Sequence, residues 1–309
     1  AFAAADVVVE GHYRTQAQEH ACLESESALA WVDEGNLIVR APSQNVYFDR
    51  REVARVTGWE KARVHIQQQP MGAAFGARED LYCQHHAALA SLAMGGRPVK
   101  VSMTREETFV ATTKRHPFDM HYRVAATRDG RILGLDATVL ADTGAYASWA
   151  PNILRKALVH GGGAYSLDSV RIEAWSVYTN NGYAGAFRGF GAPQVFFAVE
   201  SIVDELARAL DMDPVELRRR HMLRVGTTTA TGQLLHASVG LEQCMDAATG
   251  AVDDPRYGAR HHEGDWQWGL GYAHAHYGIG YGGGIPDIGS AVLELLPDGR
   301  VQLRISTVD

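Results

Sequence analysis

Cysteine is scarce in this sequence, with three residues in 309. Cys22, Cys83 and Cys244 lie far apart, are odd in number and form no C-x-x-C pair. This spacing argues against a disulfide framework, a zinc ribbon and an iron–sulfur site within the chain. We interpret the three thiols as reduced and mostly buried, as free cysteines commonly are.

Long apolar runs and a strong charge of one sign are also missing. No apolar stretch approaches the roughly 20 residues that a membrane-spanning helix needs, and the start of the chain has no basic segment typical of a signal peptide. The formal net charge is -7, with acidic and basic residues interspersed. We therefore expect a cytoplasmic protein that binds neither nucleic acid nor an anionic membrane surface.

The composition that remains is that of a globular protein, with 46% hydrophobic and 21% charged residues. Alternating patterns predict strands, and apolar residues repeating every three to four positions predict helices. The predicted strands cover 7–13, 36–40, 64–67, 99–103, 121–127, 132–140 and 171–178. The predicted helices cover 45–57, 81–94, 195–210 and 241–248. Hairpins mixed with helices favour an α+β fold, with mixed sheets packed with helices, over a doubly wound parallel sheet.

Several local signals support these boundaries. Thr104 and Glu107 have the spacing of a capping box at the start of a helix. Asp129-Gly130 separates two strand patterns and is the strongest hairpin signal in the chain. Asp213 directly precedes Pro214, and this pair predicts the start of a further helix.

The polar stretch 253–265 contains proline and glycine and predicts a domain boundary. We expect one domain over 1–250 and the start of a second over 251–309. Strands are predicted there over 269–277, 291–296 and 301–306. His274 and His276 would share one face of the first of these strands. Metal binding is one interpretation of this pair, and ordinary packed histidines are the simpler one.

Three segments have residue types suited to binding. Gly72–Glu79 combines small residues, which let a ligand approach the backbone and its amides, with the aromatic Phe75. Gly185–Gln194 places Arg188 between glycines and phenylalanines before a long helix, whose N-terminus attracts anions. The third segment is Pro42–Asn45. Each also has an ordinary explanation: a strand–turn–helix corner, a glycine-rich loop with a structural ion pair, and an N-cap.

Taken in order, five segments resemble the large, molybdenum-cofactor-binding subunit of the molybdenum hydroxylases, the xanthine dehydrogenase and aldehyde oxidase family. They are Gln18–Glu24, Pro42–Asn45, the loop at Phe75-Gly76, Arg115–Phe118 and Ala186–Gln194. The likeness runs along essentially the whole chain, and 187–191 is close to a signature. It implies an oxidoreductase that hydroxylates an aldehyde or N-heteroaromatic carbon with oxygen derived from water.

The resemblance also implies cofactors and partners. The cofactor would be molybdopterin, as Mo-molybdopterin or its cytosine dinucleotide form, with molybdenum held through the pterin dithiolene and by no side chain directly. Gln44 matches a glutamine beside the apical oxo ligand, and Phe75, Gly76, Arg188 and Gly189 match residues of the cofactor loops. Electrons would leave through [2Fe-2S] clusters, and in many members then FAD, on partner subunits or domains.

Three further residues match positions near the substrate. Phe190 matches an aromatic residue that packs on the substrate ring, and Glu79 matches a carboxylate that orients the substrate of purine-oxidising members. Lys156 stands where those members have an arginine, a departure that weakens the match to xanthine itself. Arg155 takes this role if the alignment shifts by one residue.

Two departures from the family pattern affect the cofactor. Ala73, Ala74 and Ala77 stand where the family loop usually has more glycine, and their methyl groups would narrow the approach. The family's general base is a glutamate in a later Gly-x-Gly-Glu segment, and this chain ends at Asp309 before it. We therefore expect a truncated segment, or the product of a split gene, that is inactive alone and needs the missing C-terminal cofactor-binding half.

Two alternatives stay open beside the hydroxylase. One is a non-catalytic fragment or assembly module of such a complex, free of cofactor when alone. It would be distinguished by whether a downstream polypeptide supplies the Gly-Glu general base. The other is a family member that removes oxygen from its substrate, which substrate scope would reveal.

Overall fold

The computed structural model describes residues 1–251, 262–263, 266–267, 269–278, 280 and 288–305. The α-helices are α1 (Val46–Thr57), α2 (Gln84–Ala93), α3 (Arg105–Ala111), α4 (Ala150–His160), α5 (Ala192–Ala209), α6 (Pro214–His221) and α7 (Leu241–Gly250). The 3-10 helices are η1 (Phe2–Ala4), η2 (Lys61–Arg63) and η3 (Ala77–Glu79). None of the helices described here combines the length and the apolarity that crossing a lipid bilayer requires.

The strands form two larger sheets and two short pairs. They are β1 (Val7–Thr15), β2 (Ser27–Asp33), β3 (Asn36–Ala41), β4 (Val64–Gln68), β5 (Val99–Ser102), β6 (Phe118–Ala126), β7 (Ile132–Gly144), β8 (Val170–Tyr178), β9 (His262–Glu263), β10 (Trp266–Gln267), β11 (Ala291–Leu295) and β12 (Val301–Ile305). The predicted α+β class, with mixed sheets packed with helices, is confirmed.

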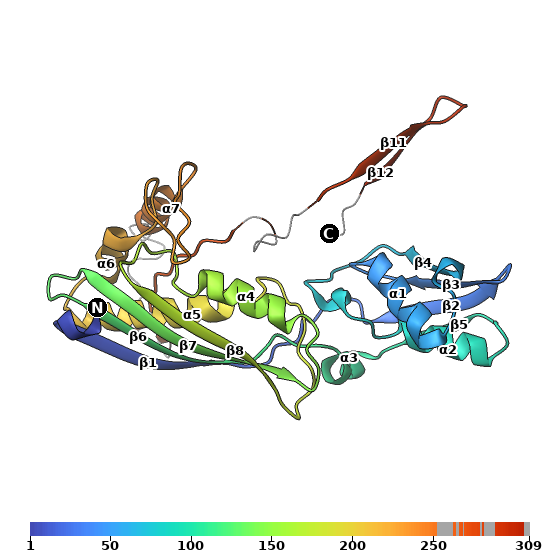
Figure 1. Cartoon of the computed structure of the whole chain (residues 1–309), viewed down its shortest axis with the longest axis horizontal. Helices are drawn as coiled ribbons and strands as arrows, with labels where there is room; N and C mark the ends of the chain where they lie inside the picture. The colour runs from blue at the N-terminus through green and yellow to red at the C-terminus, as the bar shows by residue number, and fades with distance from the viewer. Residues whose placement is uncertain (252–261, 264–265, 268, 279, 281–287, 306–309) are drawn as a thin grey trace.

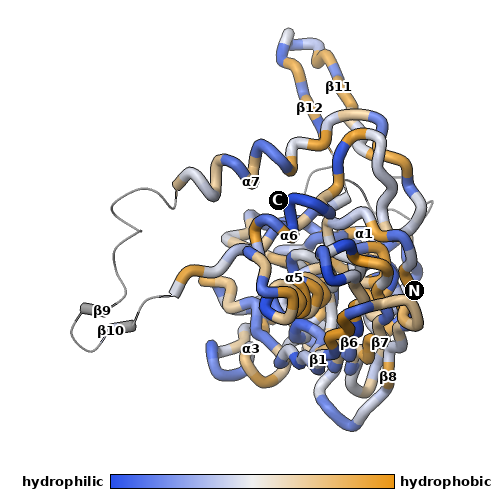
Figure 2. The backbone as a smooth tube through the Cα atoms, turned by 90° about the vertical axis from the view of Figure 1, so that its left-hand side faces the viewer, coloured by the Kyte–Doolittle hydropathy of each residue, from blue (hydrophilic) through white to orange (hydrophobic). Residues whose placement is uncertain are grey.

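The first sheet has the order β1-β6-β7-β8, with β8 parallel to β7 and the other pairs antiparallel. α5 packs on β1 and β6, and α4 packs on β8 and α5. The apolar stripe of α5, including Val199, Ile202 and Leu206, is fully buried in this core. Figure 2 shows this apolar helix beside the strands. Burial of the stripe is the main driving force that fixes α5, and thus the loop before it.

The second sheet has the order β4-β3-β2-β5, with β4 parallel to β3 and the other pairs antiparallel. Helices α1 and α2 pack on this sheet and on each other. Val53 of α1 and Ala87 of α2 join Val39 and Val64 of the strands in a separate hydrophobic core. The turns that follow β3 and β4 therefore start from strands that are packed into this core.

The chain leaves the first sheet, builds the second, and returns to the first. β1 ends at Thr15, which pairs with Phe118 at the start of β6. The two linking segments lie side by side, since the Arg115 backbone N–H donates to the Gln18 carbonyl oxygen at 2.9 Å. Figure 1 shows the two sheets at opposite sides of these links.

The predicted helix ends have the expected geometry. The Asn45 side chain accepts from the backbone of α1, and Gly58 ends that helix in the left-handed conformation. Thr104 and Glu107 form the predicted capping box. Asp213 caps α6 through two backbone amides. The β6–β7 hairpin is also confirmed. The predicted strands near the end of the chain form the antiparallel pair β11–β12, whose side chains are exposed along both strands.

The strand predicted over 269–277 is wrong, because residues 269–278 are described without strand pairing. His274 is instead buried against the Tyr165 ring, at 4.8 Å between ring centroids, and His276 lies 5.0 Å from the His160 ring. Alternating burial here comes from packing against Tyr165 and against side chains of α4 and α5, which the period-2 pattern does not distinguish from a sheet. Most of the predicted boundary at 253–265 falls outside the described residues.

Candidate functional site

A cleft of about 1170 Å³ lies between turns of the second sheet, helix α4 and the loop before α5. All residues predicted to be catalytic or cofactor-binding line this cleft: Gln44, Phe75, Gly76, Glu79, Lys156, Arg188, Gly189 and Phe190. Arg155, the alternative to Lys156, also lines it. Because these residues come from distant parts of the chain, only folding brings them to one place.

The first loop of the cleft, residues 71–77, follows β4 and leads into η3. Phe75 adopts a left-handed backbone with φ of 53°, and Gly76 follows with φ of 99°. A Cβ on Gly76 would lie 2.8 Å from the backbone carbon and oxygen of Ala186, so a side chain does not fit there. A left-handed backbone is energetically costly for a phenylalanine, so the residues around Phe75 must hold it in this conformation.

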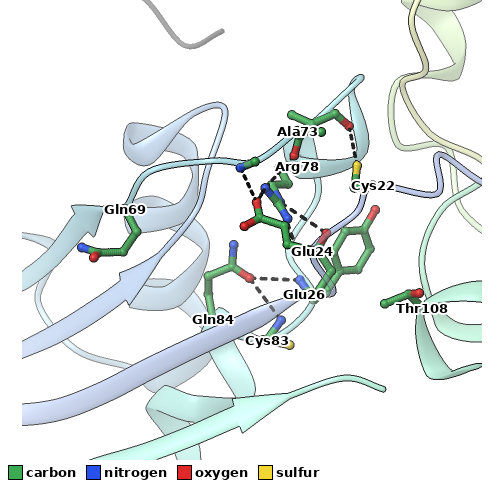
Figure 3. Close-up of polar contacts among 12 residues, drawn as sticks. Cys22, Glu24, Glu26, Gln69, Ala73, Arg78, Cys83, Gln84 and Thr108 are labelled. Atoms are coloured by element: carbon green, nitrogen blue, oxygen red, sulfur yellow. Dashed lines mark hydrogen bonds and ion pairs between the residues drawn. The ribbon is translucent and has the colours of Figure 1, made fainter. Parts of the chain in front are cut away.

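Those surroundings are a buried ion cluster around Arg78 (Figure 3). The guanidinium is 1% exposed, donates to the carboxylates of Glu24 and Glu26, and donates to the Ala73 carbonyl oxygen at 2.6 Å. Glu24 also accepts from the Gly72 backbone N–H at 2.8 Å. Burial raises the pKa of Glu24, but the hydrogen bonds from Gly72 and Arg78 outweigh it and hold that pKa below the usual value.

The second loop of the cleft, residues 186–191, directly precedes α5 and touches the first. The Arg188 backbone N–H donates to the Phe75 carbonyl oxygen at 2.8 Å. Gly189, Phe190 and Gly191 all have left-handed φ values, of 93°, 50° and 96°. The two loops therefore meet backbone to backbone, each through a turn that contains a left-handed phenylalanine.

An aromatic clamp around Phe187 holds the second loop. The His20 ring stacks on Phe187 at 4.2 Å between centroids, and the Arg115 guanidinium carbon lies 3.8 Å from the centroid of the same ring. His20 Nε2 donates to the Ala186 carbonyl oxygen at 2.7 Å, and Arg115 donates to the Arg188 carbonyl oxygen at 3.0 Å. Burial lowers the pKa of His20, which favours the neutral form of its ring.

Gln44 lies in the turn between β3 and α1. Its backbone N–H donates to the Arg78 carbonyl oxygen at 3.1 Å, which joins this turn to the first loop. Its side-chain Oε1 is buried and has no hydrogen-bond partner among the described residues. A buried amide oxygen without a partner is costly, and here it belongs to a residue that lines the cleft.

The predicted substrate residues lie around the same cleft. Phe190 makes an edge contact with Trp149, with ring centroids 6.3 Å apart. Glu79 is half-buried next to Arg78 in the chain. Lys156 is 9% exposed, and its ammonium donates to the carbonyl oxygens of Gly280 at 2.9 Å and Gly278 at 3.3 Å.

The sequence matches a known protein family. A family model described as a molybdopterin cofactor-binding domain matches residues 1–222. The chain belongs to this family.

Relatives and solved structures extend the match. The chain is 41% identical over 249 residues to the nicotinate dehydrogenase large molybdopterin subunit of Eubacterium barkeri, covering 80% of this chain and 58% of that protein. It is 35% identical over 278 residues to a xanthine dehydrogenase molybdenum-binding subunit of Escherichia coli, covering 89% and 37%. Aldehyde oxidoreductase from Desulfovibrio gigas superposes with a TM-score of 0.75 at 34% identity, covering 81% of this chain and 27% of that one. The chain thus spans only part of the length of these relatives.

The cleft has room and polar groups for a molybdopterin. The orphaned Oε1 of Gln44 is a hydrogen-bonding group that a bound molecule can satisfy. The sequence suggested that three alanine methyl groups would narrow the approach of the cofactor. Ala73 and Ala74 do line the cleft, whereas Ala77 is buried and does not line it. The loop therefore carries two additional methyl groups at the cleft, in a space of about 1170 Å³.

The residues that support the two loops were not predicted from the sequence. Glu24 and His20 lie in the resembling segment Gln18–Glu24, and Arg115 begins another, but the resemblance gave neither segment a role. Arg78 follows the stretch 72–77, which contains no charged residue, and directly precedes Glu79. An arginine in a run of small residues was the signal for a buried ion pair, because a buried guanidinium requires carboxylate or carbonyl partners.

Proposed function

We propose that this chain forms part of the molybdopterin cradle of an oxidoreductase that hydroxylates an aldehyde or N-heteroaromatic carbon with oxygen from water. The observation that carries the proposal is the meeting of the two loops, Arg188 N–H to Phe75 carbonyl oxygen at 2.8 Å, in the cleft that Gln44 lines. The names of the relatives, a nicotinate dehydrogenase subunit and an aldehyde oxidoreductase, support this substrate class.

Each cofactor-binding residue has a separate task in this proposal. The amide of Gln44 would hydrogen-bond the cofactor, and the backbone at Phe75 and Gly76 would lie close against it. Arg188, which is exposed at the cleft, would supply positive charge for an anionic group of the cofactor, with Gly189 allowing close approach. When bound, the molybdenum cofactor supplies the oxygen transfer and the two-electron redox chemistry.

The remaining residues orient the substrate. Phe190 offers an aromatic surface for a planar ring, and Glu79 offers a carboxylate that accepts hydrogen bonds from a ring N–H. Lys156 makes its end of the cleft positive, and its bonds to the carbonyl oxygens of Gly278 and Gly280 fix where that charge lies. This charge suits a substrate with a carboxylate or an electron-rich ring atom.

The proposed reaction needs a general base and a second cofactor-binding segment, and the relatives have additional chain length beyond the part that this chain matches. We place the general base and the second half of the cradle on a further polypeptide segment. Iron–sulfur centres, and in some assemblies FAD, would take the electrons away. The cofactor would be Mo-molybdopterin or its cytosine dinucleotide form.

Molybdenum analysis tests the proposal. The chain and its complex, purified from the native host, are weighed by intact mass spectrometry and analysed for molybdenum. We expect about one molybdenum per chain in the complex and a large loss of molybdenum in Gln44→Ala. The matched control Gln233→Ala should keep its molybdenum, because Gln233 is exposed and lies outside the cleft. A complex that contains no molybdenum contradicts the proposal and supports a non-catalytic assembly module instead.

A further inference from the structure

Arg78 connects the first loop of the cleft with the Gln44 turn and with the chain segment before β2. Its guanidinium bonds to Glu24 and Glu26, which lie before β2, and to the Ala73 carbonyl oxygen inside the first loop. Its own carbonyl oxygen accepts from the Gln44 backbone N–H at 3.1 Å. The residue that follows it is Glu79. Three segments of the chain thus converge on one buried residue: the stretch with Glu24 and Glu26, the first loop and the Gln44 turn.

Glu24 completes the connection at the other end of the loop. One of its oxygens accepts from the Gly72 backbone N–H and from Arg78, so the start and the end of the first loop share a single carboxylate. Cys22 adds a weaker contact, in which its thiol donates to the Ala74 carbonyl oxygen at 3.6 Å. Between these fixed points lies Phe75, whose left-handed backbone persists only where its neighbours over-determine it.

We propose that Arg78 is a positioning residue, which through Glu24 and Glu26 fixes the first loop, the Gln44 turn and Glu79 in the geometry that binds the cofactor. The expected effect of Arg78 on cofactor binding rests on the proposed function, whereas its effect on the geometry of the first loop does not. A planar guanidinium is needed because it must serve two carboxylates and a carbonyl oxygen at once, whereas an ammonium on a flexible stem does not reach all three with the same geometry.

A control for this proposal exists in the same chain. Arg218 is also fully buried and also serves two carboxylates, donating to Glu200 at 2.8 Å and to Asp204 at 2.7 Å. It lies in the core of the first sheet and does not line the cleft. Arg218→Met therefore removes an equivalent buried charge without touching the first loop.

The first experiment is amide hydrogen exchange on the 309-residue chain, which needs no cofactor. The reporters are the hydrogen-bonded amides of Ala77, Glu79 and Gln44. At denaturant concentrations where Arg78→Met and Arg218→Met are equally stable, we expect these amides to exchange about tenfold faster or more in the Arg78 variant alone, as loss of charged hydrogen bonds implies. Arg78→Lys should fall between wild type and Arg78→Met. Equal exchange in the Arg78 and Arg218 variants would overturn the proposal.

The second experiment measures molybdenum per folded chain in the purified complex. We expect Arg78→Met to lose most of its molybdenum, Arg78→Lys to regain part of it, and Arg218→Met to keep it at the same fraction folded. Full loading of Arg78→Met would overturn the proposal for the cofactor. Absence of molybdenum from the wild-type complex would contradict the proposed function, and the exchange experiment would still decide whether Arg78 positions the loop.

Discussion

The two loops of the cleft reach the same kind of conformation by different means. The first loop is held by the charges of Arg78, Glu24 and Glu26, and the second by the stacking of His20 and Arg115 on Phe187. Both contain a phenylalanine with a left-handed backbone. A cluster of buried charges demands exact partners, because a charge left alone is strongly unfavourable. A ring stack tolerates small shifts better, because each of its many dispersion contacts contributes little by itself.

The largest expected effect is at the charged loop. Arg78→Met leaves Glu26 buried without its cation, and we expect the free energy of unfolding to fall by about 3–5 kcal/mol. Urea denaturation measures the loss, with Arg171→Met as the control because the Arg171 ion pairs are exposed. The control should lose less than about 1 kcal/mol. Equal losses in the two variants would show that the buried cluster contributes no more than a surface pair.

The next effect tests the joint between the loops. Gly76→Ala places a methyl group against the backbone of Ala186 in a left-handed conformation, and we expect a loss of about 2–4 kcal/mol. Gly58→Ala is the matched control, because Gly58 has a similar φ of 72° and open space around it. It should lose only about 1 kcal/mol. A loss in Gly76→Ala no larger than in the control would mean that the loops separate easily.

Asp80 lies between the two loops, because it follows the first loop and its carboxylate is close to Gly185, just before the second loop. It therefore tests whether pH changes the stability of this junction. Burial raises the pKa of Asp80 to about 6, and its carboxylate accepts from the Ser148 hydroxyl. Because the folded protein binds this proton more tightly than the unfolded chain, protonated Asp80 stabilises the fold below pH 4, and this contribution is lost as the pH rises through about 6. Relative to wild type, we expect Asp80→Asn to gain about 2 kcal/mol between pH 4 and pH 7 in thermal or urea unfolding. A stability difference that does not change with pH would contradict a raised pKa for the partly buried Asp80 carboxyl.

The smallest effect is expected at the stacked loop. Arg115→Gln removes the cation–π contact with Phe187 and the hydrogen bond to Arg188, at a cost of about 1–2 kcal/mol. Arg63→Gln is the control, since Arg63 also lies over an aromatic ring and donates to a carbonyl oxygen, but at the exposed surface. Urea unfolding should show a smaller loss there. If Arg115→Gln costs as much as Arg78→Met, the contrast between the two loops is wrong.

Local patterns predicted most of the elements that carry the site. The stripe of α5, the Asn45 cap of α1 and the β6–β7 hairpin depend on neighbours close in the sequence, so they could be read before any tertiary contact was known. β2 and α4 were not predicted, although Pro151 in the first turn of α4 and the buried Ile153 and Ala157 one turn apart were signals for that helix.

The sequence by itself determined which segments line the cleft, because small residues, a loop arginine and a following helix are local properties that the family resemblance ordered along the chain. Only the tertiary structure decided how those segments are held. The contact of Arg78 with Glu24, the stack of His20 on Phe187, and the bonds of Lys156 to Gly280 each join residues more than 50 positions apart. Such contacts depend on the packing of two separate cores, and no local pattern specifies which distant carboxylate, ring or carbonyl oxygen will face a given side chain.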